Sequence, residues 1–210
     1  MMKTKVIFFA VMALLLIGGL VACKAGLKEE TYKRVSVERV TLSIPTDWQR
    51  PEGVTESIEA VKSSWDPLQA QSIEMDYYVV PESKEAIINI IQWDMAEHAE
   101  LLGDSWKGWE AMLEPEGFSK EDFTNLLSSG FIGNIDALTR TVHQQLDIQG
   151  YEAWESQFTG EMEGESKWLS LLVVYAENDA VIVLLFVNED VRAKYTPIWN
   201  KIRDSVECSS

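Results

Sequence analysis

The sequence predicts an α+β fold, in which an antiparallel sheet has helices packed on it. Two patterns carry this prediction. Several short segments alternate apolar and polar residues and are joined by tight turns, which is typical of antiparallel strands. The last segment instead places its apolar residues at helical spacing, at Tyr195, Ile198, Trp199, Ile202 and Val206. Runs of strands followed by helices favour α+β over a regular alternation of the two.

The first predicted strands lie on either side of residue 39. Apolar residues alternate in one phase at 35–37 and in the opposite phase at 40–44. The shift of one residue between them indicates either a β-bulge or a tight turn between two strands. Pro45 ends the pattern, because its nitrogen carries no hydrogen for a ladder bond. A loop follows at 49–55.

A short helix and then a hairpin are predicted next. The helix covers residues 57–64. Alternation at 73–79 indicates a strand, and the apolar segment 87–93 is its antiparallel partner. The turn between these two strands contains Pro81.

The middle of the chain predicts two helices. Trp106, Trp109 and Leu113 are spaced by three and four residues, as on one helix face. After a Pro-Glu-Gly break, Ser119 resembles an N-terminal cap ahead of an apolar stripe at 123–127.

Four strands are predicted in the second half of the chain, at residues 139–148, 151–158, 168–175 and 181–187. The first also fits a helix, but its Thr-rich start and the following Gly150 favour a strand. Charged turns are predicted at 161–165 and 177–179. The segment 181–187 has no polar residue and is expected in the centre of the sheet.

The chain is expected to close with the helix that carries Tyr195 and Trp199. Pro197 is tolerated in the first turn of a helix, where its missing N–H has no intrahelical partner. This places the predicted start of the helix at 196–197.

The N-terminus reads as a secretory leader. Lys3 and Lys5 precede an uncharged run at residues 6–22, which matches a signal peptide. The alternative is a single transmembrane helix, for which the run is at the short limit of roughly 17–25 residues. Gly18 and Gly19 suit a cleavage region better than a helix interior.

The leader ends in Leu20-Val21-Ala22-Cys23, which resembles the lipobox of bacterial lipoproteins. The resemblance implies cleavage before Cys23, diacylglycerol on its sulfur and a further acyl chain, such as palmitate, on its amine. Two acyl chains anchor a protein stably. The alternative is a cysteine that ends a signal peptide by chance.

The lipobox implies a signal peptide at 1–22. The polar segment that follows Cys23 reads as a lipidated tether at 23–32, and the remaining length and patterns indicate a single α+β domain at 33–207. The lipobox also implies an extracytoplasmic, membrane-anchored location. Lys24, in place of the Asp that commonly retains lipoproteins in the inner membrane, favours the outer membrane of a two-membrane bacterium. In a one-membrane organism the domain faces outward from the cytoplasmic membrane.

The chain is strongly acidic, with a formal charge of −16. Loss of the leader removes Lys3 and Lys5 and no acid, which leaves −18. This charge argues against nucleic acid as a partner and against a polybasic contact with anionic lipid. If Cys23 is lipidated, Cys208 has no partner for an intrachain disulfide.

Three local features together resemble the PsbP-like fold: Ser43-Ile44-Pro45 followed by Trp48, a strand opened by Gly150-Tyr151-Glu152-Ala153-Trp154, and a final helix ending near Asp204-Ser205-Val206. The resemblance covers most of residues 33–207. It implies a binding or assembly protein with no reaction of its own, and Trp48 and Trp154 are expected in the core. No residue matches a family metal or partner site.

No catalytic or cofactor motif is recognisable. The chain has two histidines and no HExxH, CxxC, GxSxG, P-loop or GxGxxG pattern, so no catalytic residue, metal ligand or cofactor is predicted. The candidate partner-binding residues are Trp93, Trp106 and Trp109, since Trp is favoured at binding hot spots. The alternative is that these side chains pack helices onto the sheet.

These patterns predict a membrane-anchored extracytoplasmic lipoprotein. Its domain is expected to be a non-enzymatic binding or assembly module of the cell envelope, with a protein or envelope partner. One alternative is a small-ligand carrier or enzyme with a site between sheet and helices. Another is a weak calcium- or metal-binding module, for which the acidic turn at 161–165 is the candidate.

Overall fold

The computed structural model describes residues 31–63, 67–83, 85–96, 121, 136–162, 164–176 and 179–209. The strands are β1 (Tyr32–Val37), β2 (Val40–Pro45), β3 (Ile73–Val79), β4 (Ala86–Asp94), β5 (Asp136–Ile148), β6 (Tyr151–Met162), β7 (Glu165–Ala176), β8 (Asp179–Asn188) and β9 (Glu207–Cys208). The helices are α2 (Val54–Lys62), α3 (Pro67–Ser72) and α7 (Arg192–Arg203), with a 3-10 turn η1 (Glu189–Val191) before the last.

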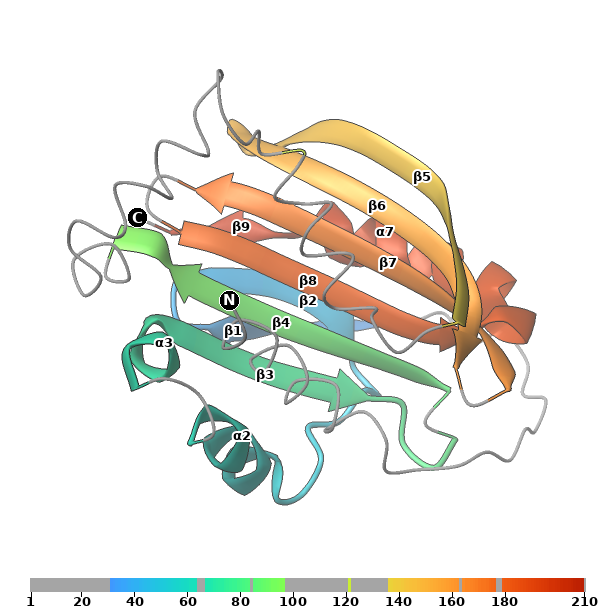
Figure 1. Ribbon diagram of the computed structural model, residues 1–210, viewed down its shortest axis with the longest axis horizontal. Coiled ribbons are helices and arrows are strands. Elements are labelled where there is room, and N and C mark those ends of the chain that lie inside the picture. Colours follow the sequence, from blue (N-terminus) through green and yellow to red (C-terminus); the bar gives the residue numbers. More distant parts are fainter. Residues whose placement is uncertain are drawn as a thin grey trace.

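The strands form two antiparallel sheets. The large sheet has six strands in the order β3-β4-β8-β7-β6-β5, and the small sheet has the order β1-β2-β9. Figure 1 shows α7 and the small sheet behind the large sheet, while α2 and α3 lie beside β3. The predicted α+β class, an antiparallel sheet with helices packed on it, is therefore confirmed.

The turns between neighbouring strands follow from local sequence. β1 pairs with β2 up to Val37↔Val40, so residues 38–39 form a tight turn, one of the two alternatives that the phase shift allowed. At the β5–β6 hairpin, Gln149 and Gly150 have φ values of 56° and 88°. Two consecutive left-handed residues are typical of the turns that match the twist of paired strands.

β8 lies in the centre of the large sheet, as predicted, and its first nine residues are buried. The predicted hairpin β3–β4 and the strand choice for β5 are also confirmed. β6 and β7 are longer than predicted, because their ladder continues to Met162↔Glu165. The acidic residues of this region belong mostly to strand ends, where their side chains can reach solvent.

The main core fills the space between the large sheet, the small sheet and α7. Helix α7 contributes Tyr195, Ile198, Trp199 and Ile202, the apolar face that its sequence period predicted. The small sheet contributes Leu42 and Ile44, among others. The ring centroids of Trp48 and Tyr195 are 6.1 Å apart. Trp48 therefore lies in the core, as expected.

The predicted start of the last helix is wrong. Helix α7 begins at Arg192, and Pro197 lies inside it rather than in its first turn. Pro197 is exposed, so the carbonyl that loses a hydrogen-bond donor there can meet water. Tyr195 lies in the helix, as its apolar period predicted, and burial of its large ring offsets the hydrogen bond that Pro197 removes.

Helix α2 also begins earlier than predicted, at Val54, which is buried. The two helices predicted at 106–127 lie outside the described residues. Of the helices that the structure describes, none combines the length and the apolar character needed to cross a membrane.

Candidate functional site

Of the four predicted site residues, the structure describes Trp93. Cys23, Trp106 and Trp109 lie outside the described residues, so the lipid site and the tryptophan cluster stay predictions. Trp93 is half-buried on β4, where it packs with apolar residues on the face of the large sheet that points away from α7. Trp154 packs on that same face and is half-buried, so it belongs to the second apolar cluster rather than to the main core.

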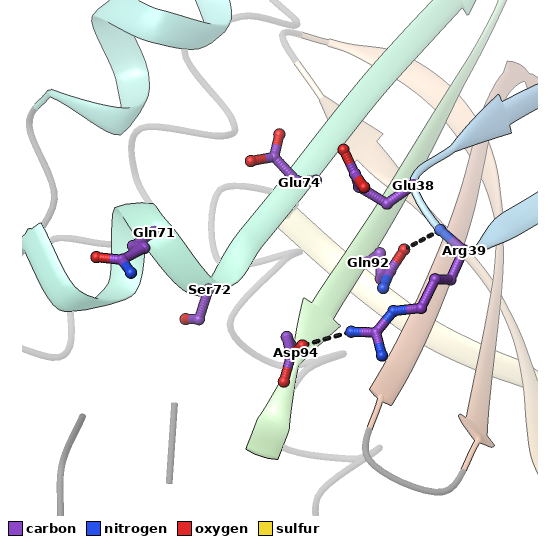
Figure 2. Close-up of a pocket in the computed structure, with 7 residues that line it drawn as sticks. All are labelled: Glu38, Arg39, Gln71, Ser72, Glu74, Gln92 and Asp94. Atoms are coloured by element: carbon purple, nitrogen blue, oxygen red, sulfur yellow. Dashed lines mark hydrogen bonds and ion pairs between the residues drawn. The ribbon is translucent and has the colours of Figure 1, made fainter. Parts of the chain in front are cut away.

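A polar pocket of about 220 Å³ lies where the small sheet meets the large one. The β1–β2 turn, the end of α3 and the strands β3 and β4 each supply part of its wall (Figure 2). All of its lining residues are polar or charged: Glu38, Arg39, Gln71, Ser72, Glu74, Gln92 and Asp94.

Arg39 fixes the geometry of this pocket. Its backbone N–H donates to Gln92 Oε1 at 2.8 Å, and its guanidinium donates to Asp94 and, at 3.0 Å, to Asp179. Its carbonyl accepts a hydrogen bond from the backbone N–H of Ser209 at 2.8 Å. The turn of the small sheet is thereby bonded to the large sheet and to the C-terminal segment.

Asp179 is the buried member of this group, with 6% of its surface exposed. Burial raises the pKa of its carboxyl group, and the nearby Asp94 raises it further. The Arg39 guanidinium and a hydrogen bond from Gln92 act in the opposite direction, but the net pKa remains above the ordinary value. The charge on Asp179 thus depends on Arg39.

Cys208 lies beside this group on β9 and is half-buried. Burial, and to a smaller extent Asp179, raises the pKa of its thiol to about 11. Since the thiolate is the reactive form, the raised pKa lowers the reactivity of this cysteine near neutral pH.

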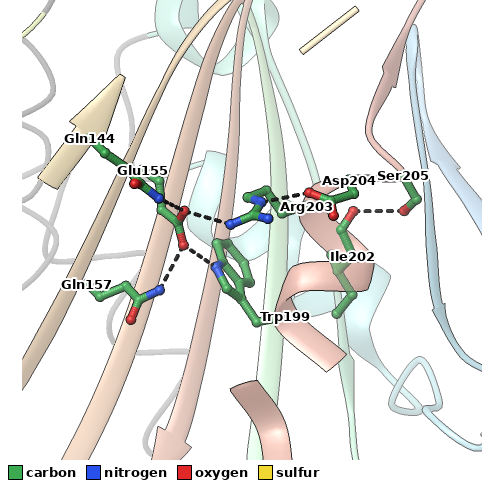
Figure 3. A network of polar contacts seen from close by, with 8 residues as sticks. All are labelled: Gln144, Glu155, Gln157, Trp199, Ile202, Arg203, Asp204 and Ser205. Atoms are coloured by element: carbon green, nitrogen blue, oxygen red, sulfur yellow. Dashed lines mark hydrogen bonds and ion pairs between the residues drawn. The ribbon is translucent and has the colours of Figure 1, made fainter. Parts of the chain in front are cut away.

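A second polar network surrounds Glu155, which is fully buried between β6 and α7 (Figure 3). Its carboxylate accepts hydrogen bonds from Trp199 Nε1 at 2.6 Å, Arg203 Nη1 at 2.9 Å, and the amides of Gln144 and Gln157 at 2.8 Å each. Burial alone would raise its pKa, but these donors together hold the pKa below its ordinary value. The network joins α7 to the sheet and leaves little capacity for a ligand.

His143 forms a third polar group on β5. Its Nδ1 lies 2.8 Å from Ser156 Oγ, its Nε2 lies 3.3 Å from Glu121 Oε1, and its ring stacks on Trp154 at 4.9 Å. A serine, a histidine and a carboxylate in this order could resemble a nucleophilic relay. Ser156 is fully buried, however, so a substrate cannot reach its hydroxyl.

No cluster of three His, Cys, Asp or Glu side chains that could hold a metal ion occurs within the part of the chain that the structure describes. Among the described polar groups, the polar pocket is the one open to solvent, whereas Glu155 and Ser156 are buried. Sequence reasoning missed the pocket, although one signal was present: Gln92 is polar on the face of β4 that Ile88 and Ile90 occupy before it. Glu155 gives the same signal on β6, at an inward position two residues from Ala153.

No protein-family model and no curated protein sequence matches this chain. The chain is similar to the solution structure of cyanobacterial PsbP from Synechocystis, with 11% identity, a TM-score of 0.48 and coverage of 90% of this chain and 99% of that one. It is similar to the Ran-binding protein Mog1p of Saccharomyces cerevisiae, with 10% identity, a TM-score of 0.45 and coverage of 86% and 96%. It is also similar to LpqN of Mycobacterium tuberculosis, described as involved in cell envelope biogenesis, with 12% identity, a TM-score of 0.41 and coverage of 87% and 93%.

Proposed function

We propose that this chain is a bacterial lipoprotein, anchored through lipid on Cys23, whose extracytoplasmic domain binds or assembles a protein or envelope partner without catalysing a reaction. The observation that carries the proposal is the lipobox-like Leu20-Val21-Ala22-Cys23 at the end of an uncharged leader. The first described strand begins at Tyr32, a few residues later. The tether would therefore hold the domain close to the membrane surface.

The described polar groups support a binding role. The carboxylate of Glu155 is occupied by four donors, and the hydroxyl of Ser156 is buried. The polar pocket, by contrast, opens to solvent, and hydrogen bonds and ion pairs hold part of its lining, at Arg39, Gln92 and Asp94. A preformed recess of this kind suits recognition of a partner.

The lipid anchor is tested by Cys23→Ser in cells fed an alkyne analogue of palmitate. The wild-type chain should take up the label and sediment with membranes, because two acyl chains hold a protein there stably. Cys23→Ser should lose the label. The matched control is Cys208→Ser, which removes the chain's other cysteine and should keep both label and membrane association.

An unlabelled wild-type chain, or equal label in Cys23→Ser and wild type, would contradict the lipid anchor. Loss of the label in Cys208→Ser would mean that Cys208, and not Cys23, carries the acyl group. The membrane that holds the protein is identified by separating inner and outer membranes on a density gradient, where Lys24 favours the outer fraction.

A further inference from the structure

We propose that the polar pocket lined by Glu38, Arg39, Glu74 and Asp94 binds one basic side chain, a lysine ammonium or an arginine guanidinium, of a protein partner. This inference rests on the proposed binding function and adds the chemistry of the recognised group. Two of its lining residues, Gln92 and Asp94, flank the predicted partner-binding Trp93 in the sequence, but Trp93 packs on the opposite face of the large sheet.

The size and the polarity of the pocket limit what it can hold. Its volume of about 220 Å³ lies below the range of roughly 300–1,000 Å³ that is usual for pockets holding a whole drug-sized ligand. The lining residues are all polar or charged, so an apolar group would leave them without hydrogen-bond partners. The pocket therefore suits the charged end of a single long side chain.

The floor of the pocket is built before any ligand arrives. Ser72 and Gln92 are each only 3% exposed, although both are polar. Gln92 is oriented by the hydrogen bond that it accepts from the backbone N–H of Arg39 and by the one that it donates to Asp179. A side chain that enters thus meets fixed dipoles and loses little free energy to rearrangement of the protein.

The charge around the pocket selects a cation. Arg39 is opposed by two carboxylates, those of Asp94 and Asp179. Glu74 is paired with Lys62 at 2.8 Å and keeps nearly half of its side chain exposed. With Glu38 included, four carboxylates face two cations, which gives a formal charge of −2.

The whole chain adds to this preference, since its formal charge is −16. An acidic surface attracts a basic partner over a distance of about 8–10 Å at ordinary ionic strength. The pocket would then receive one cationic group at short range, where a matched charge pair gives specificity. An anionic group would meet like charge both at the surface and inside the pocket.

The test uses the full lipidated chain in detergent micelles, isotope-labelled for NMR. The probe is Nα-acetyl-arginine methylamide, and Nα-acetyl-norleucine methylamide is the uncharged control probe. The arginine probe should shift the backbone signal of Arg39 and the side-chain amide signal of Gln92, with a dissociation constant of about 1 mM, as expected for one small contact. The norleucine probe should leave both signals in place.

The double variant Glu38→Gln/Glu74→Gln should weaken binding of the arginine probe by about tenfold. The matched control is Glu82→Gln. Glu82 is an exposed glutamate in a hairpin turn and, like Glu38, has a positive φ, at 65° against 45°, but it does not line the pocket. It should change the affinity by less than about twofold.

Equal binding of the two probes, an equal loss of affinity in Glu82→Gln, or no shift at Arg39 and Gln92 would overturn the pocket proposal. The mass of the same sample reports acylation of Cys23 independently. If the chain is lipidated but does not bind the arginine probe, only the pocket proposal is contradicted. If the chain binds the arginine probe but carries no lipid, only the proposed lipid anchor is contradicted.

Discussion

The guanidinium of Arg39 lies 3.0 Å from the carboxylate of Asp179, although 140 positions separate the two residues in the chain. Arg39 belongs to the turn of the small sheet, and Asp179 begins the central strand β8 of the large sheet. This ion pair stabilises the charged form of the nearly buried Asp179 carboxylate. It also holds the Arg39 side chain in the wall of the polar pocket. It is therefore the first feature to test by mutation.

Arg39→Met should lower the free energy of unfolding by about 2 kcal/mol. The variant keeps an apolar stem but leaves the nearly buried Asp179 without its cation, which costs more than a surface pair is worth. The measurement is urea unfolding of the purified protein followed by tryptophan fluorescence. Arg34→Met is the control, because Arg34 and Glu207 form an exposed ion pair, and it should cost less than about 1 kcal/mol. Equal losses in both variants would contradict the assigned role of Arg39.

Glu155→Gln should destabilise the protein by about 3 kcal/mol. The substitution removes the buried one of the two carboxylate charges that pair with Arg203, and it places an amide NH2 group opposite donors in either orientation of the side chain. Glu161→Gln, at an exposed position on the same strand, should change the stability by less than about 0.5 kcal/mol. A loss below about 1 kcal/mol for Glu155→Gln would show that the network does not hold α7 to the sheet.

Acidification should weaken the protein through Glu155. The pKa of its carboxyl group is lower in the folded state than its ordinary value of 4.5, so its contribution to stability is present above pH 4.5. That contribution is lost as the pH falls through the lower folded pKa. Asp179 has a raised pKa and acts in the opposite direction.

The pH effect of Glu155 is isolated by comparing the wild type with Glu155→Gln. The stability gap between them should be constant from pH 7 to about 5 and should narrow below pH 4.5, as followed by thermal unfolding. A stability difference between the wild type and Glu155→Gln that grows as the pH falls would contradict a lowered pKa of Glu155.

Cys208 should react slowly with a thiol reagent in the folded protein. A pKa raised from 9.0 to about 11 reduces the thiolate fraction at pH 8 by about 100-fold. Unfolding in urea should restore the ordinary rate, as measured with Ellman's reagent. A native rate equal to the unfolded rate would show that the thiol is not shielded.

The sequence predicted the elements better than the contacts between them. Alternation identified strands such as β3, an uninterrupted apolar run located the central strand β8, and the helical period of Tyr195 and Trp199 identified the buried face of α7. These signals are local, because side-chain direction repeats every two residues in a strand and every 3.6 in a helix. The start of α7 was misplaced, since burial of Tyr195 outweighed the preference of Pro197 for a first turn.

The polar pocket could not be derived from the same patterns. Arg39, Asp94 and Asp179 meet only because the small sheet is set against the end of β4 and the start of β8. That placement depends on which face of each sheet is buried and on the register between distant strands. The sequence showed only that Gln92 and Glu155 are polar where neighbouring inward positions are apolar.

The central claim, a lipid anchor on Cys23, is tested most directly by the intact mass of the protein purified from membranes. We predict a chain that begins at Cys23 and carries a diacylglycerol group, with a further acyl chain on the N-terminal amine, and whose single free thiol is Cys208. A chain that keeps residues 1–22, or that begins at Cys23 without added lipid, would contradict the account.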